Sequence, residues 1–227
     1  MHVYCDFDGT ISIEDATDFI LARLADPEWE VVERQWQDGL IGSGDCMRRQ
    51  IALLRAKQQE LDEVLEDVVI DPTFPSFVEF CANEGLPLTI VSDGVDYFIN
   101  RILARHQLDH LPVIANKLIV GDFGGHASYR LSSPYSDPEC VTAAGVCKCR
   151  SLTLHDTCVY IGDGRSDFCV SDKPELVFAK GKLADYCFGQ DIPFVAYQTF
   201  NDLTWSLKSF IPALQGHPAD ILRYATA

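Results

Sequence analysis

The chain has 227 residues, of which 47% are hydrophobic and 23% charged, with 15 glycines and 11 prolines. This length and balance predict one domain, or one core carrying a sizeable insertion, and exclude a stapled miniprotein and a largely disordered chain. Lys and Arg number 18 against 34 Asp and Glu, a net charge of −16. That excess of acid opposes a broad nucleic-acid surface and binding to anionic membranes.

Neither the apolar runs nor the cysteines suggest a membrane or secreted protein. No apolar run approaches the roughly 18 residues that suggest a membrane span, and the start HVYCDFD lacks the basic and apolar segments of a signal peptide. The nine cysteines are an odd number and several, such as Cys5 and Cys158, lie in apolar runs. Reduced thiols are therefore favoured over a disulfide framework, and a cytoplasmic location is expected.

Five short apolar runs have the length of strands, and their apolar character on both faces is typical of a parallel sheet. They span residues 2–7, 86–92, 158–163, 176–180 and 193–197. Between the early runs, apolar residues recur at offsets of three and four from Phe74 to Cys81 and from Val95 to Leu103. This alternation predicts a doubly wound parallel α/β fold, with a terminal helix beyond Gln198.

Two intervals break the alternation. Residues 14–71 show helical stripes without a strand candidate, which predicts a helical cap domain inserted after the first strand, the core being 1–13 and 72–227. The second interval contains NKLIVGDFGGHASYRL, which predicts a small β-hairpin insertion near 113–135.

Acidic residues follow the first predicted strand in the run Asp6-Phe7-Asp8-Gly9-Thr10. Residues two apart on a strand point to the same face, so Asp6 and Asp8 can meet at one site. Two neighbouring carboxylates repel unless a cation neutralises them or one holds a proton. An ordinary acidic turn after a strand remains the alternative, since Asp and Gly favour turns.

Two later strands end in similar residues. Gly162-Asp163-Gly164-Arg165-Ser166-Asp167 follows one, and Ser92-Asp93-Gly94 follows the other. In an open parallel sheet the ligand site forms outside the carboxyl ends of the strands, so these segments should lie together. Carboxylates that converge there suit Mg²⁺ shared with a substrate phosphate, while a hydroxyl and free N–H groups suit an anion.

These segments occur in the order of the motifs of the haloacid dehalogenase superfamily of phosphatases. Residues 6–10 resemble its first motif, Ser92 its second, and Gly162-Asp163-x-x-x-Asp167 its fourth. The third motif requires a lysine, for which Lys148 is the best placed, with Lys173, Lys180 and Lys182 as rivals. The resemblance extends from Tyr4 to about Ala179.

The resemblance implies a Mg²⁺-dependent phosphomonoester hydrolase that works through an aspartyl phosphate. Asp6 would be the nucleophile and Asp8 the general acid and base. Ser92 and Lys148 would hold the phosphoryl oxygens. The metal ligands would be Asp6, Asp8 through its main-chain carbonyl, Asp163 and Asp167, and the further phosphate-binding residues would be Thr10, Asp93 and Gly94.

Substrate selection is expected from the cap. A cap in this position resembles that of phosphoserine phosphatases, which use a Glu for the substrate ammonium and an Arg for its carboxylate. Asp15 and Gln50 occupy those places here, and a neutral Gln cannot supply the cationic fork that a carboxylate prefers. Phosphoserine is therefore disfavoured. Arg48, Arg49 and Arg23 are the cap's cationic candidates, although ordinary surface charge or packing would explain each at least as well.

The segment Cys140-(x6)-Cys147-Lys148-Cys149 points to two other branches of the family. It resembles the methionine-salvage phosphatases of 2-hydroxy-3-keto-5-methylthiopentenyl-1-phosphate and the phosphoethanolamine/phosphocholine phosphatases. Glu14-Asp15 and residues 92–96 favour the first. The hypothesis is thus a hydrolase of a small phosphorylated metabolite, a monomer or homodimer without nucleic-acid or membrane partners. A phosphate-binding protein that retains the fold without turnover is the non-enzymatic alternative.

The same cysteines leave a second question open. Cys140, Cys147 and Cys149 could supply three zinc ligands, with His126 as a fourth, but Cys-x-Cys lacks the usual two-residue gap. Reduced structural thiols are the favoured interpretation.

Overall fold

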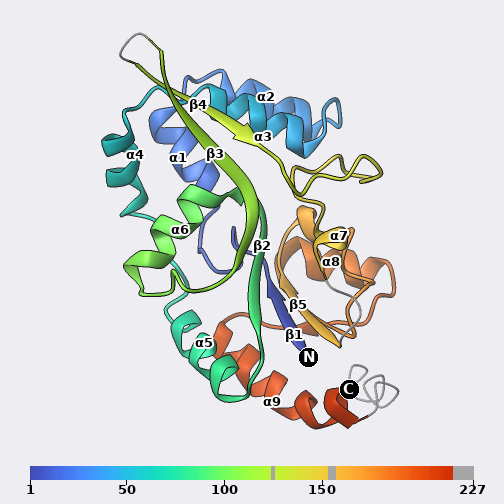
Figure 1. The fold of residues 1–227 in the computed structure, drawn as a ribbon. Helices are drawn as coiled ribbons and strands as arrows, with labels where there is room; N and C mark the ends of the chain where they lie inside the picture. Colours follow the sequence, from blue (N-terminus) through green and yellow to red (C-terminus); the bar gives the residue numbers. More distant parts are fainter. Residues whose placement is uncertain (124–125, 153–156, 217–227) are drawn as a thin grey trace.

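The structure is a computed structural model that describes residues 1–123, 126–152 and 157–216 (Figure 1). Its centre is a seven-stranded sheet of order β4-β3-β2-β1-β5-β6-β7, in which all neighbours pair in parallel except β3 and β4. The predicted doubly wound α/β fold is confirmed, and each of the five predicted apolar runs contains a strand. The strands are β1 (His2–Cys5), β2 (Leu88–Val95), β3 (Val113–Phe123), β4 (His126–Ser132), β5 (Cys158–Gly162), β6 (Leu176–Ala179) and β7 (Val195–Ala196).

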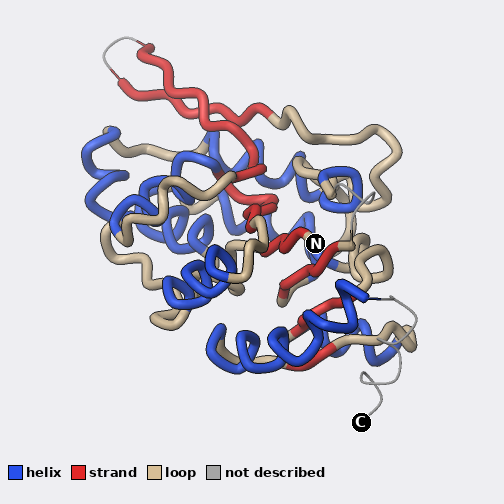
Figure 2. Tube along the Cα trace, turned by 60° about the horizontal axis from the view of Figure 1, so that its bottom comes forward, coloured by secondary structure: helices blue, strands red, loops and turns tan. Residues whose placement is uncertain are grey.

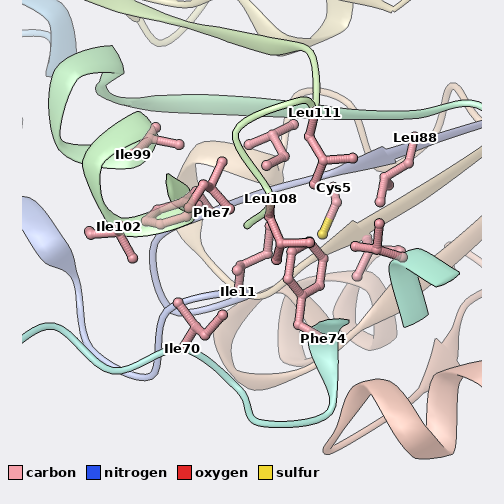
Figure 3. Close-up of a cluster of buried hydrophobic side chains, with 14 of the residues drawn as sticks. Cys5, Phe7, Ile11, Ile70, Phe74, Leu88, Ile99, Ile102, Leu108 and Leu111 are labelled. Carbon is pink, nitrogen blue, oxygen red and sulfur yellow. The ribbon is translucent and has the colours of Figure 1, made fainter. Parts of the chain in front are cut away.

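Helices cover both faces of the sheet because successive strand residues point to opposite sides. Cys5 belongs to a large apolar cluster shared with α5, α6 and α9, whereas Tyr4 belongs to a smaller cluster that includes Leu152 and Val170. Figure 3 shows part of the large cluster, where Phe7 lies beside Ile99 and Ile102 of α6. The core helices are α5 (Phe74–Asn83), α6 (Asp96–Arg105), α7 (Lys148–Ser151), α8 (Gly181–Gly189) and α9 (Phe200–Gly216).

Four helices lie between β1 and α5: α1 (Ala16–Leu24), α2 (Trp29–Gln37), α3 (Ser43–Ala52) and α4 (Gln58–Leu65). The chain leaves the core and returns to it at one place, where Ser12 and Ile70 form an antiparallel bridge. The Ile13 N–H donates to the Val69 carbonyl at 2.9 Å beside this bridge. The helical segment expected at 14–71 is thus connected to the core by two chain segments that lie side by side.

The hairpin expected near 113–135 is continuous with the core sheet. Its first strand, β3, pairs in antiparallel register with β4 but also in parallel with β2, where Ile90 is opposite Val113. Hydrophobic pattern alone does not distinguish a core strand from a hairpin strand, because both bury apolar residues. The hairpin extends beyond the helices in Figure 2, and its strand β4 packs against α3.

Within these described ranges, no helix is both long and apolar enough to cross a membrane.

Candidate active site

The turn after β1 places two carboxylates at the carboxyl edge of the sheet. Phe7 is fully buried, and since neighbouring side chains alternate in direction, Asp6 and Asp8 both point away from the core that holds it. Gly9 has a φ of 73°, and a Cβ built on it would lie 2.5 Å from Oδ2 of Asp163. The turn therefore needs glycine both for its backbone conformation and for the close approach of this carboxylate.

Asp6, Asp163 and Asp167 bring carboxylate oxygens within 4.8 Å of one another. Asp163 directly follows β5, and Asp167 ends the short 3₁₀ turn Arg165–Asp167. The N–H groups of Asp163 and Gly164 each donate to Oδ2 of Asp167 at 3.0 Å. This backbone cradle fixes Asp167 towards Asp6 and explains why the acids of two separate strand ends converge.

Lys148, the first residue of α7, inserts its side chain into this cluster and is only 1% exposed. Its Nζ lies 2.8 Å from Oδ1 of Asp6 and 2.6 Å from Oδ1 of Asp167, and it donates to Oγ of Ser166 at 2.9 Å. Burial alone would lower the pKa of Lys148, but the charges of Asp167 and Asp6 outweigh it and raise that pKa above its usual value. Lys148 is therefore a permanent cation between the carboxylates.

One lysine does not balance the three carboxylates. Burial, followed by the charge of Asp167, raises the pKa of Asp6 despite Lys148, and the same two causes raise the pKa of Asp163. An excess of negative charge in a cradle of oxygen atoms is what a hard divalent cation would neutralise. The donor set of Asp6, Asp163 and Asp167 thus fits Mg²⁺, and among the described residues it is the one cluster of this kind.

Asp8 and Ser92, from two different motifs, contact each other. The register of β2 against β3 shifts between Val91 and Val95, and such a bulge redirects the side chains within it. The Ser92 hydroxyl donates to Oδ2 of Asp8 at 3.4 Å, and the Ala16 N–H donates to its Oδ1 at 2.8 Å. Burial, and then the charge of Asp15, raises the pKa of Asp8. Asp8 thereby favours the protonated form that a general acid needs.

A sequence profile of the haloacid dehalogenase-like hydrolases matches residues 3–171, which include every residue of this cluster. The chain belongs to this hydrolase family. The match begins in β1 and ends after the turn that carries Asp167, so it covers the whole predicted series of motifs. The resemblance drawn from residues 6–10, Ser92 and 162–167 is therefore confirmed at the level of the family.

Curated relatives of this hydrolase are similar over nearly their whole length. A 2-hydroxy-3-keto-5-methylthiopentenyl-1-phosphate phosphatase of Brevibacillus brevis is 30% identical over 88% of this chain and 92% of its own. The Pdp3-interacting factor 1 of Schizosaccharomyces pombe is 28% identical over 92% and 95%. A structure of phosphoserine phosphatase with its phospho-aspartyl intermediate analogue has a TM-score of 0.61 at 20% identity, covering 87% of this chain and 93% of its own. Family and relatives together support a phosphatase.

Two residues expected to bind phosphate use their side chains elsewhere in this hydrolase. The Thr10 hydroxyl donates to Oδ1 of Asp163 at 2.8 Å, so it orients a carboxylate of the cluster. The Asp93 carboxylate accepts hydrogen bonds from the Ser43 hydroxyl and the Val146 N–H, both at 2.9 Å. Asp93 thus connects α3 to the segment before Lys148. Gly94 donates its N–H to Oγ of Ser92 at 2.9 Å.

The four residues expected to select the substrate have different surroundings. Arg48 and Arg49 pair with Asp45 on their own helix and line a hollow of about 360 Å³ against β4. Gln50 is buried and donates to Oε2 of Glu33 at 3.0 Å. Asp15 caps α1 and accepts from the Asp18 N–H.

Asp15 is the cap residue that is electrostatically linked to Asp8. Asp15 is exposed at the surface, yet crowding by nearby protein atoms, and then the charge of Glu33, raises its pKa. Asp15 therefore links Glu33 electrostatically to Asp8.

Three contributors to the site were not predicted. Tyr160 is fully buried, and its hydroxyl donates a hydrogen bond to Oδ1 of Asp167 at 2.5 Å. The Ser166 hydroxyl accepts a hydrogen bond from Lys148. The Glu33 carboxylate accepts one from the side-chain amide of Gln50. In the sequence, Tyr160 is an ordinary aromatic residue of an apolar strand. Its contact with Asp167 becomes visible only in the structure, where its hydroxyl points inward. Ser166, directly before Asp167, was the one that its position in the motif could have suggested.

The suggested zinc ligands do not form a compact cluster. Cys147 and Cys149 have their sulfurs 3.3 Å apart, but within the described ranges they belong to no set of three ligands that meets the spacing of a metal site. The side chain of His126 lies outside what the structure describes. All nine cysteines are free, in line with the reduced thiols that were favoured.

Proposed function

We propose that this protein hydrolyses the phosphomonoester of a small phosphorylated metabolite through an aspartyl phosphate on Asp6, and that the metabolite is 2-hydroxy-3-keto-5-methylthiopentenyl-1-phosphate. The observation that carries the reaction type is the Lys148 ammonium between Asp6 and Asp167. The substrate rests on the relatives that bear this name, one of which is 30% identical over 88% of the chain.

The metal part of the proposal rests on the acidic cluster. Asp6, Asp163 and Asp167 would hold Mg²⁺ with the main-chain carbonyl of Asp8, since the side chain of Asp8 is engaged by Ser92 and Ala16. When bound, the ion would supply positive charge that lets a phosphate dianion approach the Asp6 carboxylate. The nucleophile, the general acid and base, and the other phosphate-binding groups are side chains of the protein itself.

Asp6 attacks phosphorus and forms the aspartyl phosphate while the bond to the alcohol oxygen breaks. Asp8 donates its proton to that departing oxygen and then takes one from the water that hydrolyses the aspartyl phosphate. The raised pKa of Asp8 suits the first of these steps. Lys148 neutralises charge on the phosphoryl oxygens, and the Ser92 hydroxyl, close to Asp8 at 3.4 Å, is positioned to bind another.

Residues 14–71 would act as the cap that selects the substrate. Asp93 accepts the Ser43 hydroxyl of α3, so the cap and core touch beside the site. Phosphoserine is a weaker candidate because Gln50, in the place of the carboxylate-binding Arg, is neutral and already paired with Glu33. The acids Asp15 and Glu33 favour phosphoethanolamine or phosphocholine as the second candidate, because the positive charge of either substrate would compensate their negative charge.

The test is a comparison of kcat/KM with Mg²⁺ across 2-hydroxy-3-keto-5-methylthiopentenyl-1-phosphate, phosphoserine, phosphoethanolamine and phosphocholine. The first should give the highest value, and a preference for either amine would transfer the assignment to the second candidate. Asp6→Asn is the control for reaction type. Equal turnover of p-nitrophenyl phosphate by Asp6→Asn and the wild type would refute the aspartyl-phosphate route, and no turnover by either would favour a binding protein.

A further inference from the structure

Asp93 follows Ser92 at the carboxyl edge of the sheet, but the reaction proposed above gives its carboxylate no step. The residue is only 9% exposed. Its Oδ2 accepts the Ser43 hydroxyl at 2.9 Å, and its Oδ1 accepts the Val146 N–H at 2.9 Å and the side-chain NH₂ of Asn116 at 3.2 Å. A buried carboxylate with three donors from the protein is suited to holding its neighbours in place.

The two donors at 2.9 Å come from the cap and from the segment before the proposed catalytic lysine. Ser43 is the first residue of α3. Val146 is buried and stands two residues before Lys148, the first residue of α7. The bond from Val146 to Asp93 therefore fixes the backbone from which the Lys148 side chain reaches into the acidic cluster.

The cap and this segment also touch backbone to backbone. The Gly44 N–H of α3 donates to the Ala143 carbonyl at 3.1 Å. A Cβ built on Gly44 would lie 2.9 Å from the nitrogen of Gly145, which is closer than side chains normally pack. Such a close approach leaves α3 little room to move independently of residues 143–146. Asp93 thus lies at the junction of two parts that are already in tight contact.

We propose that Asp93 is a positioning residue for Lys148, whose Oδ1 sets the start of α7 through the Val146 N–H and whose Oδ2 fastens the cap through Ser43. The two oxygens have separate effects, one on the placement of the lysine and the other on the placement of the cap. Groups that act in catalysis need such support, because their own geometry must be held closely. The inference rests on the function proposed above for Lys148.

Asp93→Ala removes both attachments. It should lower the kcat for p-nitrophenyl phosphate about 10- to 100-fold, since a misplacement of ~1 Å in a catalytic group costs on the order of 100-fold in rate. Asp93→Asn is the conservative variant: its amide oxygen can accept from Val146, and its NH₂ group can donate to the Ser43 oxygen. It should keep a kcat near that of the wild type. An Asp93→Asn enzyme as slow as Asp93→Ala would overturn the proposal, because the charge of Asp93 would then be what matters.

Ser43→Ala tests the second oxygen alone. Loss of the bond to the cap should raise KM, because fewer molecules hold the cap in its binding position. The kcat should stay near that of the wild type, because the bond from Val146 to Asp93 remains. A fall in kcat as large as that of Asp93→Ala would contradict the separate effects of the two oxygens.

The matched control is Asp71→Ala. Asp71 is another buried carboxylate, and it accepts the N–H groups of Thr73 and Phe200, so it joins the chain after the cap to α9. Its removal should lower the unfolding temperature without a comparable fall in kcat. If Asp71→Ala and Asp93→Ala lost kcat equally, the effect of Asp93 would be general destabilisation.

A double variant tests whether Asp93 acts through Lys148. In the Lys148→Ala background, adding Asp93→Ala should leave kcat unchanged, because the lysine that Asp93 positions is already absent, and residues that act as a unit are not additive. A merely structural role of Asp93 would lower kcat again in the double variant. That second fall would refute the assignment.

A measurement without turnover separates this inference from the proposed function. Acetic anhydride is added to the full-length protein with Mg²⁺, and acetylation of Lys148 is followed by peptide mass spectrometry. Lys148 is buried in the wild type, and in Asp93→Ala it should react at least about tenfold faster, because local opening of the segment admits the reagent. Asp71→Ala should react like the wild type.

An inactive wild type with this labelling pattern would refute the proposed function but not the positioning of Lys148 by Asp93. Equal protection of Lys148 in folded Asp93→Ala and in the wild type would refute the positioning. If Asp93→Ala does not fold, Gly145→Ala replaces it, because a Cβ there would collide with Oδ1 of Asn116 and displace the same segment. The same two outcomes then decide.

Discussion

The Nζ of Lys148 lies 2.8 Å from Oδ1 of Asp6, although 142 residues separate them in sequence and both side chains are almost completely buried. The lysine enters from the start of α7, on the sheet face opposite the large apolar cluster. Removing one member of a buried ion pair leaves the other without compensation. Lys148 is therefore expected to serve both the reaction and the stability of the apoprotein.

Lys148→Ala should lower kcat/KM about 10²- to 10³-fold, the usual cost of removing one group that stabilises transition-state charge. In the metal-free protein it should also lower the unfolding temperature, because Asp6 and Asp167 then face each other without their cation. Steady-state kinetics and thermal melts measure the two effects. Lys173→Ala is the control, because Lys173 pairs with Asp172 at an exposed position. A Lys148→Ala enzyme of normal activity would remove this lysine from the mechanism.

The charge of Asp15 raises the pKa of Asp8 after burial, which makes the pH profile testable. Asp8 must be protonated to donate to the leaving group, so kcat falls as pH rises through its pKa. Asp15→Asn removes a negative charge, lowers the pKa of Asp8, and should move this falling limb to lower pH. The kcat of both proteins is followed over a pH series at saturating substrate. Glu14→Gln, which neutralises the neighbouring exposed carboxylate, should leave the limb in place, and an equal shift in both variants would refute the specific link.

The fold could be predicted because five of its strands lie in short, mostly apolar runs. Cys158–Gly162, for example, is fully buried and is followed by Asp163-Gly164 of the site. The role of β3 could not be predicted in the same way, since its pairing with β2 depends on which strand lies beside it in space. A one-dimensional pattern contains no information on that neighbour.

The site divides along similar lines. The acids near strand ends could be predicted because their spacing reflects the alternation of a strand and the turn that follows it. The directions of the Thr10 and Asp93 side chains could not, because both are set by partners far along the chain, Asp163 and Ser43. Tyr160 was missed for another reason, since nothing in an apolar strand shows that its hydroxyl points inward to Asp167.

The metal-free protein should lose stability as pH rises. Burial raises the pKa values of Asp6, Asp8 and Asp163 in the folded state above the ~3.9 of an unfolded Asp. A raised folded pKa contributes stability that is fully present below the unfolded pKa and is lost as pH increases through the folded one. Thermal melts in EDTA should therefore give a lower unfolding temperature near pH ~8 than near ~5.5. Millimolar Mg²⁺ should raise the unfolding temperature by a larger amount at the higher pH.

Asp163→Asn tests whether the repulsion among the buried carboxylates, and not some other pH-sensitive group, causes the loss of stability at high pH. The substitution removes one of the mutually repelling charges and retains an oxygen that can accept the Thr10 hydroxyl, which donates at 2.8 Å in the wild type. In EDTA near pH ~8 it should raise the unfolding temperature, and it should reduce the stabilisation by Mg²⁺. A Mg²⁺ response unchanged from the wild type would show that Asp163 is not a ligand.

A substitution at Gly94 tests whether Asp8 must lie close to β2 for turnover. A Cβ at this position would collide with Oδ2 of Asp8 and lie 3.0 Å from Oγ of Ser92, so Gly94→Ala must displace the proposed general acid. Since a misplacement of ~1 Å costs on the order of 100-fold in rate, kcat should fall about 10- to 100-fold. Gly189→Ala is the matched control, because a Cβ there meets nothing within 4 Å, and it should retain wild-type kcat. Circular dichroism and melts confirm that both variants are folded. If folded Gly94→Ala turned over substrate at the wild-type rate, the position of Asp8 seen here would not be the one used in proton transfer.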